Sequence, residues 1–87
     1  ASDVYKRQFP VRPHNLDTNH HVNNAQFISL AIECLPKDFS VHRMRAEYKQ
    51  QAHLGDILCP RRAEMENGCF VSLNDEKGQS YVVVEFQ

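Results

Sequence analysis

The sequence has neither a dominant charge nor a long apolar run. Its 87 residues carry 10 Lys and Arg against 11 Asp and Glu, so the formal net charge is −1. The basic residues are scattered or paired, which gives no electrostatic reason to expect nucleic acid as a partner. No segment is long and apolar enough to cross a bilayer, and the polar residues 1–8 lack the apolar core of a signal peptide. We therefore expect a cytoplasmic protein without membrane insertion.

Cysteine is scarce and follows no metal-binding or redox pattern. The count is odd and there is no CxxC, which argues against a disulfide framework and a zinc knuckle. We expect reduced and mostly buried thiols. The cysteines are Cys34, Cys59 and Cys69.

Several histidines and an aspartate, which are common metal ligands, cluster before residue 22. The stretch from Asp17 could open a calcium loop, but Val22 and Ile28 occupy the positions where an EF-hand needs Gly and Glu. The spacing of the histidines in this stretch fits no common zinc site. We expect no metal and no cofactor.

The length supports a single domain. Residues 1–8 begin without Met and are expected to be either non-native or a segment that leads into a strand. Residues 9–87 are expected to form the domain itself. No internal repeat and no low-complexity segment divides them.

Residues 24–35, NAQFISLAIECL, predict a helix. Gln26, Ser29 and Glu33 are spaced three and four apart and form one narrow polar stripe. The other faces are apolar, which is typical of a helix buried on most sides. Asn23 or Asn24 is a suitable N-cap, and Pro36 ends the helix by restricting the residue before it.

After the helix, the apolar period changes from helical to two. Residues 41–54 predict a long half-exposed strand, and residues 57–65, 69–73 and 81–86 predict three more strands. Gly55-Asp56 and Asn67-Gly68 are turn signals, and Pro60 indicates an edge or a bulge. One apolar helix followed by consecutive antiparallel strands predicts an α+β domain. The layout matches the hotdog fold, an antiparallel β-sheet wrapped around one central helix.

Directly before the helix lies the polar stretch HNLDTNHHVNNAQF, residues 14–27. Such residues often serve only as caps and turns, and that explanation covers part of the stretch. A functional interpretation starts from the free N–H groups and positive dipole at a helix start, which suit a developing oxyanion. Asp17, Asn19 and His21 alternate, so in an extended chain they would point the same way and could orient a water molecule. The stretch has no Ser or Cys nucleophile, which favours direct attack by water.

LDTNHHVNNAQF resembles the Asp-x-Asn-x-His-Val-Asn-Asn-x-x-aromatic signature of acyl-ACP thioesterases, and MRAEYKQQAHLGD is similar to the strand that follows in that family. The resemblance covers roughly residues 10–86. Family members have two tandem hotdog repeats with the signature in the second, so residues 9–87 resemble the C-terminal repeat. The resemblance implies hydrolysis of fatty acyl-ACP thioesters to free fatty acid and holo-ACP, in fatty-acid biosynthesis.

The resemblance also implies roles for individual residues. Asn19 contacts the attacking water, Asp17 and His21 position Asn19 and assist proton transfer, and the helix start near Asn23 and Asn24 holds the oxyanion. Gln51 stands where many members have Glu, and its amide cannot accept a proton. The neighbouring position, where plant members often have Cys, is Ala52, so a Cys nucleophile is excluded there.

The implied partners are an acyl carrier protein and a second hotdog, either another copy of the chain or an N-terminal repeat. Arg43, Arg45 and Lys49 offer positive charge to an acidic carrier. Met44, Ala46 and Tyr48, together with the helix, offer an apolar lining for an acyl chain. Two alternatives stay open. One is a hotdog module that binds acyl thioesters without turnover, and the other is a hotdog acyl-CoA thioesterase.

Overall fold

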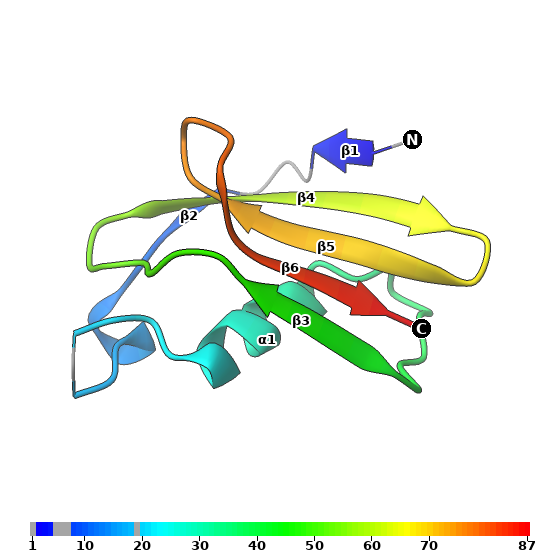
Figure 1. The fold of residues 1–87 in the computed structure, drawn as a ribbon, viewed down its shortest axis with the longest axis horizontal. Helices are drawn as coiled ribbons and strands as arrows, with labels where there is room; N and C mark the ends of the chain where they lie inside the picture. Colours follow the sequence, from blue (N-terminus) through cyan, green and yellow to red (C-terminus); the bar gives the residue numbers. More distant parts are fainter. Residues whose placement is uncertain (1, 5–7, 19) are drawn as a thin grey trace.

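One helix lies against one face of an antiparallel sheet in the computed structural model, which describes residues 2–4, 8–18 and 20–87 (Figure 1). The described strands pair in the order β1-β4-β5-β6-β3, and β2 also pairs with β4. This arrangement confirms the predicted α+β hotdog fold. In chain order the elements are β1 (Ser2–Val4), β2 (Phe9–Pro10), the 3₁₀ helix η1 (Pro13–Asn15), α1 (Asn24–Glu33), β3 (Met44–Tyr48), β4 (Ile57–Met65), β5 (Gly68–Asn74) and β6 (Ser80–Phe86).

The start of α1 is set by a side-chain cap. Asn23 is extended at φ −79° and ψ 164°, and its Oδ1 accepts a hydrogen bond from the Gln26 N–H at 2.9 Å. This confirms one of the two predicted N-caps. The helix ends at Glu33, two residues earlier than predicted, because the chain turns at Cys34 before it reaches Pro36.

The prediction that α1 is buried on most sides is wrong. Phe27 and Ala31 are buried against the sheet, while Ile28 and Leu30 are only partly covered. Ile32 is 47% exposed. A single sheet covers one face of the helix, and the sequence pattern cannot reveal whether a second layer covers the other face.

The central hairpin agrees with its predicted bounds. β4 covers 57–65 and pairs with β5 so that Met65 lies opposite Gly68. The two turn residues are therefore Glu66 and Asn67, and Gly68 begins the next strand instead of forming the turn. Glycine is required there because a Cβ would collide with the backbone carbonyl oxygen of Phe86.

Pro60 lies inside β4, between two pairings that the described residues make. On one side of β4, β2 pairs with residues 57–58 and β1 pairs with residues 61–63. Pro60 falls between them and lies opposite Leu73 of β5. A residue without an N–H cannot donate to a strand ladder, so its place between the two described pairings suits Pro60.

β3 is much shorter than the predicted 41–54. It covers 44–48 and pairs only with β6 among the described strands, with Met44 opposite Phe86. As an edge strand it has little cover, and Met44 is 48% and Tyr48 43% exposed. The chain leaves the strand after Tyr48, where the Lys49 N–H donates to the Tyr81 carbonyl at 2.8 Å.

The apolar core lies between α1 and the inner face of β4, β5 and β6. Leu58, Leu73, Val82, Val84 and Phe86 are fully buried there. These residues alternate along their strands, as expected for a sheet with one covered face. The core therefore holds α1 in a fixed position relative to the sheet, and the start of α1 lies at the same side of the molecule as the end of β3 (Figure 1).

Candidate functional site

The polar segment before α1 forms a closed loop. Leu16 and Val22 form an antiparallel bridge, and within it the Asp17 N–H donates to the His21 carbonyl at 2.9 Å. The Asp17 carboxylate accepts the His21 N–H at 3.3 Å, and His20 adopts φ 63° in the left-handed region. The extended conformation expected for 17–21 is therefore wrong, because the Asp17 side chain and the turn at His20 fold the segment back on itself.

The fold back still places Asp17 and His21 beside each other, now across the loop instead of along a strand. Asn19 lies outside the described residues. The loop is fixed to the sheet side of the molecule by a hydrogen bond from the Val22 N–H to the Ala52 carbonyl, at 3.0 Å. Ala52 is fully buried, so this contact sets the position of residues 49–53 relative to the loop.

A groove of about 510 Å³ opens where the loop, the start of α1 and the end of β3 meet. It contains all five of the candidate residues that the structure describes, and Gln51 reaches it because the strand has already ended at Tyr48. The lining residues are Asp17, His21, Val22, Asn23, Asn24, Phe27, Tyr48, Lys49, Gln50 and Gln51. The arrangement combines a carboxylate, an imidazole, amides and a helix start in one place.

Aromatic side chains form the apolar part of this region. Phe27 lies 6.5 Å from Tyr48 and 6.2 Å from Tyr81, measured between ring centroids. Burial raises the pKa of Tyr81 to about 12, and the nearby carboxylates of Asp56 and Asp75 act in the same direction. The alternation of the sequence predicted that Tyr48 lies on the apolar side of its strand, but Phe27 was not among the predicted site residues.

A buried asparagine supports the helix start from behind. Asn15 is 7% exposed, and its Oδ1 accepts the Arg12 N–H at 3.0 Å. Its Nδ2 donates to the Gln26 Oε1 at 3.2 Å. The backbone N–H of Gln26 donates in turn to the side chain of Asn23, the N-cap of α1. Asn15 therefore ties η1 to the first turn of α1. Asn15 was not among the predicted site residues, since only the tertiary contact distinguishes it from its polar neighbours.

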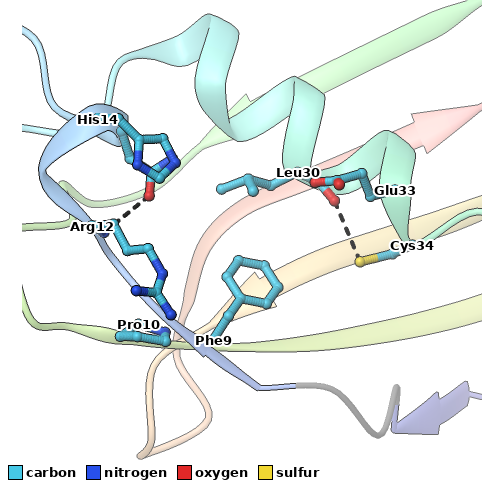
Figure 2. Close-up of a pocket in the computed structure, with 8 residues that line it drawn as sticks. Phe9, Pro10, Arg12, His14, Leu30, Glu33 and Cys34 are labelled. Atoms are coloured by element: carbon cyan, nitrogen blue, oxygen red, sulfur yellow. Dashed lines mark hydrogen bonds between the residues drawn. The ribbon is translucent and has the colours of Figure 1, made fainter.

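A second, smaller cavity lies between β2, η1 and the later half of α1 (Figure 2). Its volume is about 190 Å³, and Figure 2 shows the Phe9 ring pointing toward α1. The Cys34 thiol at its edge donates to the Leu30 carbonyl at 3.4 Å, so this thiol is engaged within the helix. None of the candidate residues that the structure describes lines this cavity.

No group of three or more His, Cys, Asp or Glu side chains among the described residues is placed to hold a metal ion. The helix in the described part of the chain is too short to cross a membrane.

Comparison with solved structures assigns the architecture. An acyl-ACP thioesterase from Bacteroides thetaiotaomicron superposes with a TM-score of 0.83 at 19% identity, over 93% of this chain and 35% of that one. A Staphylococcus aureus protein in complex with CoA gives 0.84 at 15%, over 99% and 78%. A hypothetical thioesterase from Streptococcus pneumoniae, solved with coenzyme A, gives 0.77 at 12%, over 99% and 82%. The comparison with curated proteins gives no match.

The fold thus defines a hotdog protein. The model of the acyl-ACP thioesterase C-terminal domain matches residues 1–87. The chain belongs to this family. It spans about a third of the length of the Bacteroides acyl-ACP thioesterase chain that it resembles.

Proposed function

We propose that this domain hydrolyses fatty acyl-ACP thioesters to free fatty acid and holo-ACP, as a cytoplasmic step of fatty-acid biosynthesis. The observation that supports the proposal most strongly is the groove, in which Asp17, His21 and Gln51 lie together at the start of α1. Thioester hydrolysis needs an oriented water molecule and a stabilised oxyanion. It needs little acid catalysis because a thiol with a pKa of ~8.5 is a good leaving group.

In the proposed reaction, the oxygen of a water molecule attacks the thioester carbonyl carbon. Asn19 contacts that water, while Asp17 and His21 position Asn19, and His21 accepts the proton that the water loses. The C–S bond then breaks, and the thiolate of the carrier takes that proton from His21 to leave as the thiol, which leaves His21 neutral again. The hydrogen bond from the backbone N–H of His21 to the Asp17 carboxylate supports these roles, because it holds the two residues close together.

The helix start is the proposed oxyanion site. The Asn23 side chain accepts the Gln26 N–H, and the Phe27 N–H bonds to the Asn23 carbonyl at 3.2 Å. The N–H groups of Asn24 and Ala25 precede these in the same turn and suit a negatively charged oxygen. One such donor typically contributes about 2.7–4 kcal/mol to the transition state.

Gln51 is proposed to orient the water without accepting its proton. Its side chain is exposed and lines the groove. Gln51→Glu keeps the volume nearly unchanged and adds a base, so we expect a faster reaction. A slower reaction would mean that the native amide is adapted to hold the water.

The proposed partners are an acyl carrier protein and a second hotdog. Arg45 on β3 and Arg43 just before it are both exposed and can meet an acidic carrier. β3 is the last strand of the described sheet order, and its exposed side chains include Met44 and Tyr48. Cover from a second copy or from an N-terminal hotdog repeat would bury this edge.

Acyl-CoA is the alternative substrate, favoured by the two similar structures that contain CoA. A module that binds acyl thioesters without turnover is the second alternative, favoured by Gln51. The test is release of free thiol from acyl-ACP and acyl-CoA of several chain lengths. Faster turnover of acyl-ACP supports the proposal, faster turnover of acyl-CoA supports the first alternative, and saturable binding without turnover supports the second.

A further inference from the structure

A second histidine touches the proposed proton acceptor. The rings of His21 and His53 lie edge to face, with centroids 4.9 Å apart and an angle of 81° between the planes. His53 does not line the groove, whereas His21 does. We propose that His53 is a positioning residue that holds the His21 imidazole in the orientation in which it faces the groove. This inference rests on the proposed function only for the catalytic role of His21.

His53 is held in a tight turn. Its N–H donates to the Asp56 Oδ2 at 2.8 Å, and the Asp56 N–H donates back to the His53 carbonyl at 3.0 Å. Gly55 supplies the left-handed φ of 86° that closes the turn. The Asp56 carbonyl accepts the Val11 N–H at 2.8 Å, which fastens the turn to the chain that follows β2.

The spacing between the two rings is also fixed by the backbone. Val22 and Ala52, the immediate neighbours of His21 and His53, are joined by the 3.0 Å hydrogen bond described above. Both are buried, at 5% and 0% exposure. The two histidines therefore lie on either side of an anchored backbone contact. This contact holds the two side chains close enough for their rings to touch.

The exposure of His53 separates a positioning role from a core-packing role. Its side chain is 57% exposed, so replacing it with a smaller side chain removes little buried contact area. An edge-to-face neighbour does restrict rotation of the His21 ring. A reacting group misplaced by about 1 Å can lose up to about 100-fold in rate. His53 is therefore expected to matter for rate much more than for stability.

The carboxylate of Asp56 offers a competing explanation based on charge. The His53 Nδ1 lies 3.7 Å from the Asp56 Oδ2, so a protonated His53 can pair with it. Asp17 is a further charged group that contacts the His21 segment, through the backbone N–H of His21. Replacement of His53 by Phe keeps an aromatic ring beside His21 and removes the ionisable group, which distinguishes the two explanations.

The test compares His53→Ala and His53→Phe, with His42→Ala as a control for an exposed histidine on another part of the surface. We expect His53→Ala to lower kcat for acyl-thioester hydrolysis by about tenfold, with KM changed by less than about twofold and Tm unchanged. His53→Phe is expected to keep at least about half of the rate, and His42→Ala all of it. An unchanged kcat in His53→Ala overturns the proposal. Equal losses in the Ala and Phe variants also overturn it, in favour of a role for the ionisable group.

A second readout does not depend on activity. Ring protons of His21 feel the ring current of His53, so their NMR resonances are expected to move in His53→Ala and to move much less in His53→Phe. Unmoved His21 resonances in His53→Ala would show that the rings do not meet in solution and would overturn the proposal. Absence of turnover in the unchanged protein, combined with the expected NMR shifts, would instead reject the proposed function and leave the positioning contact in place.

Discussion

β6 and β3 are neighbouring strands in one sheet, yet they differ in almost every other respect. β6 has a partner strand on both sides and places Val82, Val84 and Phe86 in the core. β3 pairs only with β6 among the described strands, and of its five residues only Ala46 is partly buried. The two strands share a register but not an environment.

The difference separates a strand that stabilises the core, β6, from a strand whose end borders the candidate site, β3. The strand with two partners closes the core, so its side chains are fixed by packing. The edge strand ends early, and the chain beyond Tyr48 is free to cross to the loop at 16–22 and carry Gln51 into the groove. The groove therefore lies where the paired part of β3 ends, at Tyr48.

The largest expected effect comes from the cross-strand pair Phe86 and Met44, which lie directly opposite each other. Phe86→Ala is expected to lower the free energy of unfolding by about 3–5 kcal/mol, because the side chain is fully buried. Met44→Ala is expected to change it by less than about 1 kcal/mol. Urea unfolding measures both. A large loss in Met44→Ala would indicate that a second hotdog covers β3, and sedimentation would then show a dimer that the variant weakens.

Two buried asparagines sharpen the comparison between the helix start and the sheet. Asn15→Leu and Asn74→Leu each remove side-chain hydrogen bonds from a buried site, so each is expected to cost about 1–3 kcal/mol. Only Asn15 is bonded to Gln26 of α1. Urea unfolding and thioester turnover, measured below the unfolding range, are expected to show a loss of kcat in Asn15→Leu alone. Equal losses of kcat would contradict a special role for the helix start.

How far the sequence predicts each region depends on whether the signal is local. The hairpin of β4 and β5 follows from alternation and from Asn67-Gly68, which are short-range features, and its bounds were predicted well. The extent of β3 and the burial of α1 depend on what packs against them, and both were overestimated. Ile32 and Met44 look like core residues in the pattern, but no second layer covers them among the described residues.

The features of the candidate site also fall into local ones, which the sequence predicts, and ones that depend on the tertiary fold. The N-cap at Asn23 is a local signal and was predicted. The folded-back loop was not, because the hydrogen bond between Asp17 and the His21 N–H competes with extended chain in a manner that alternation does not reveal. The approach of Gln51 to the loop requires the contact between Val22 and Ala52, 30 residues apart, and only the family resemblance indicated it.

Tyr81 on β6 tests the burial of the two-partner strand at high pH. The folded-state pKa of Tyr81 is raised to about 12, mainly by burial, so the folded state favours the neutral phenol. Its contribution to stability is fully present below the unfolded pKa of ~10 and is lost as the pH rises toward 12. Tyr81→Phe is expected to flatten the loss of Tm between about pH 10 and 12. Identical profiles in the variant and the unchanged protein would contradict this assignment.

The smallest effect is expected at the turn between β5 and β6. The Asp75 carboxylate accepts the Gln79 and Lys77 N–H groups at 2.9 Å each, and these bonds lower its pKa, the bond from Gln79 most. A lowered folded pKa stabilises the protein above the ordinary value near 3.8, and the contribution is lost as the pH falls through the folded value. Asp75→Asn is expected to make the urea midpoint slightly less dependent on pH between about pH 5 and 3. A steeper dependence in the variant would contradict the sign.

The central claim is that the groove at the start of α1 hydrolyses acyl thioesters with His21 as proton acceptor. The most direct measurement is the rate of free-thiol release from acyl-ACP by the unchanged protein and by His21→Ala, with Tm recorded for both. We predict turnover in the unchanged protein and a loss of about 100-fold or more in His21→Ala at nearly unchanged Tm. A His21→Ala variant that folds normally and retains the full rate would contradict the claim.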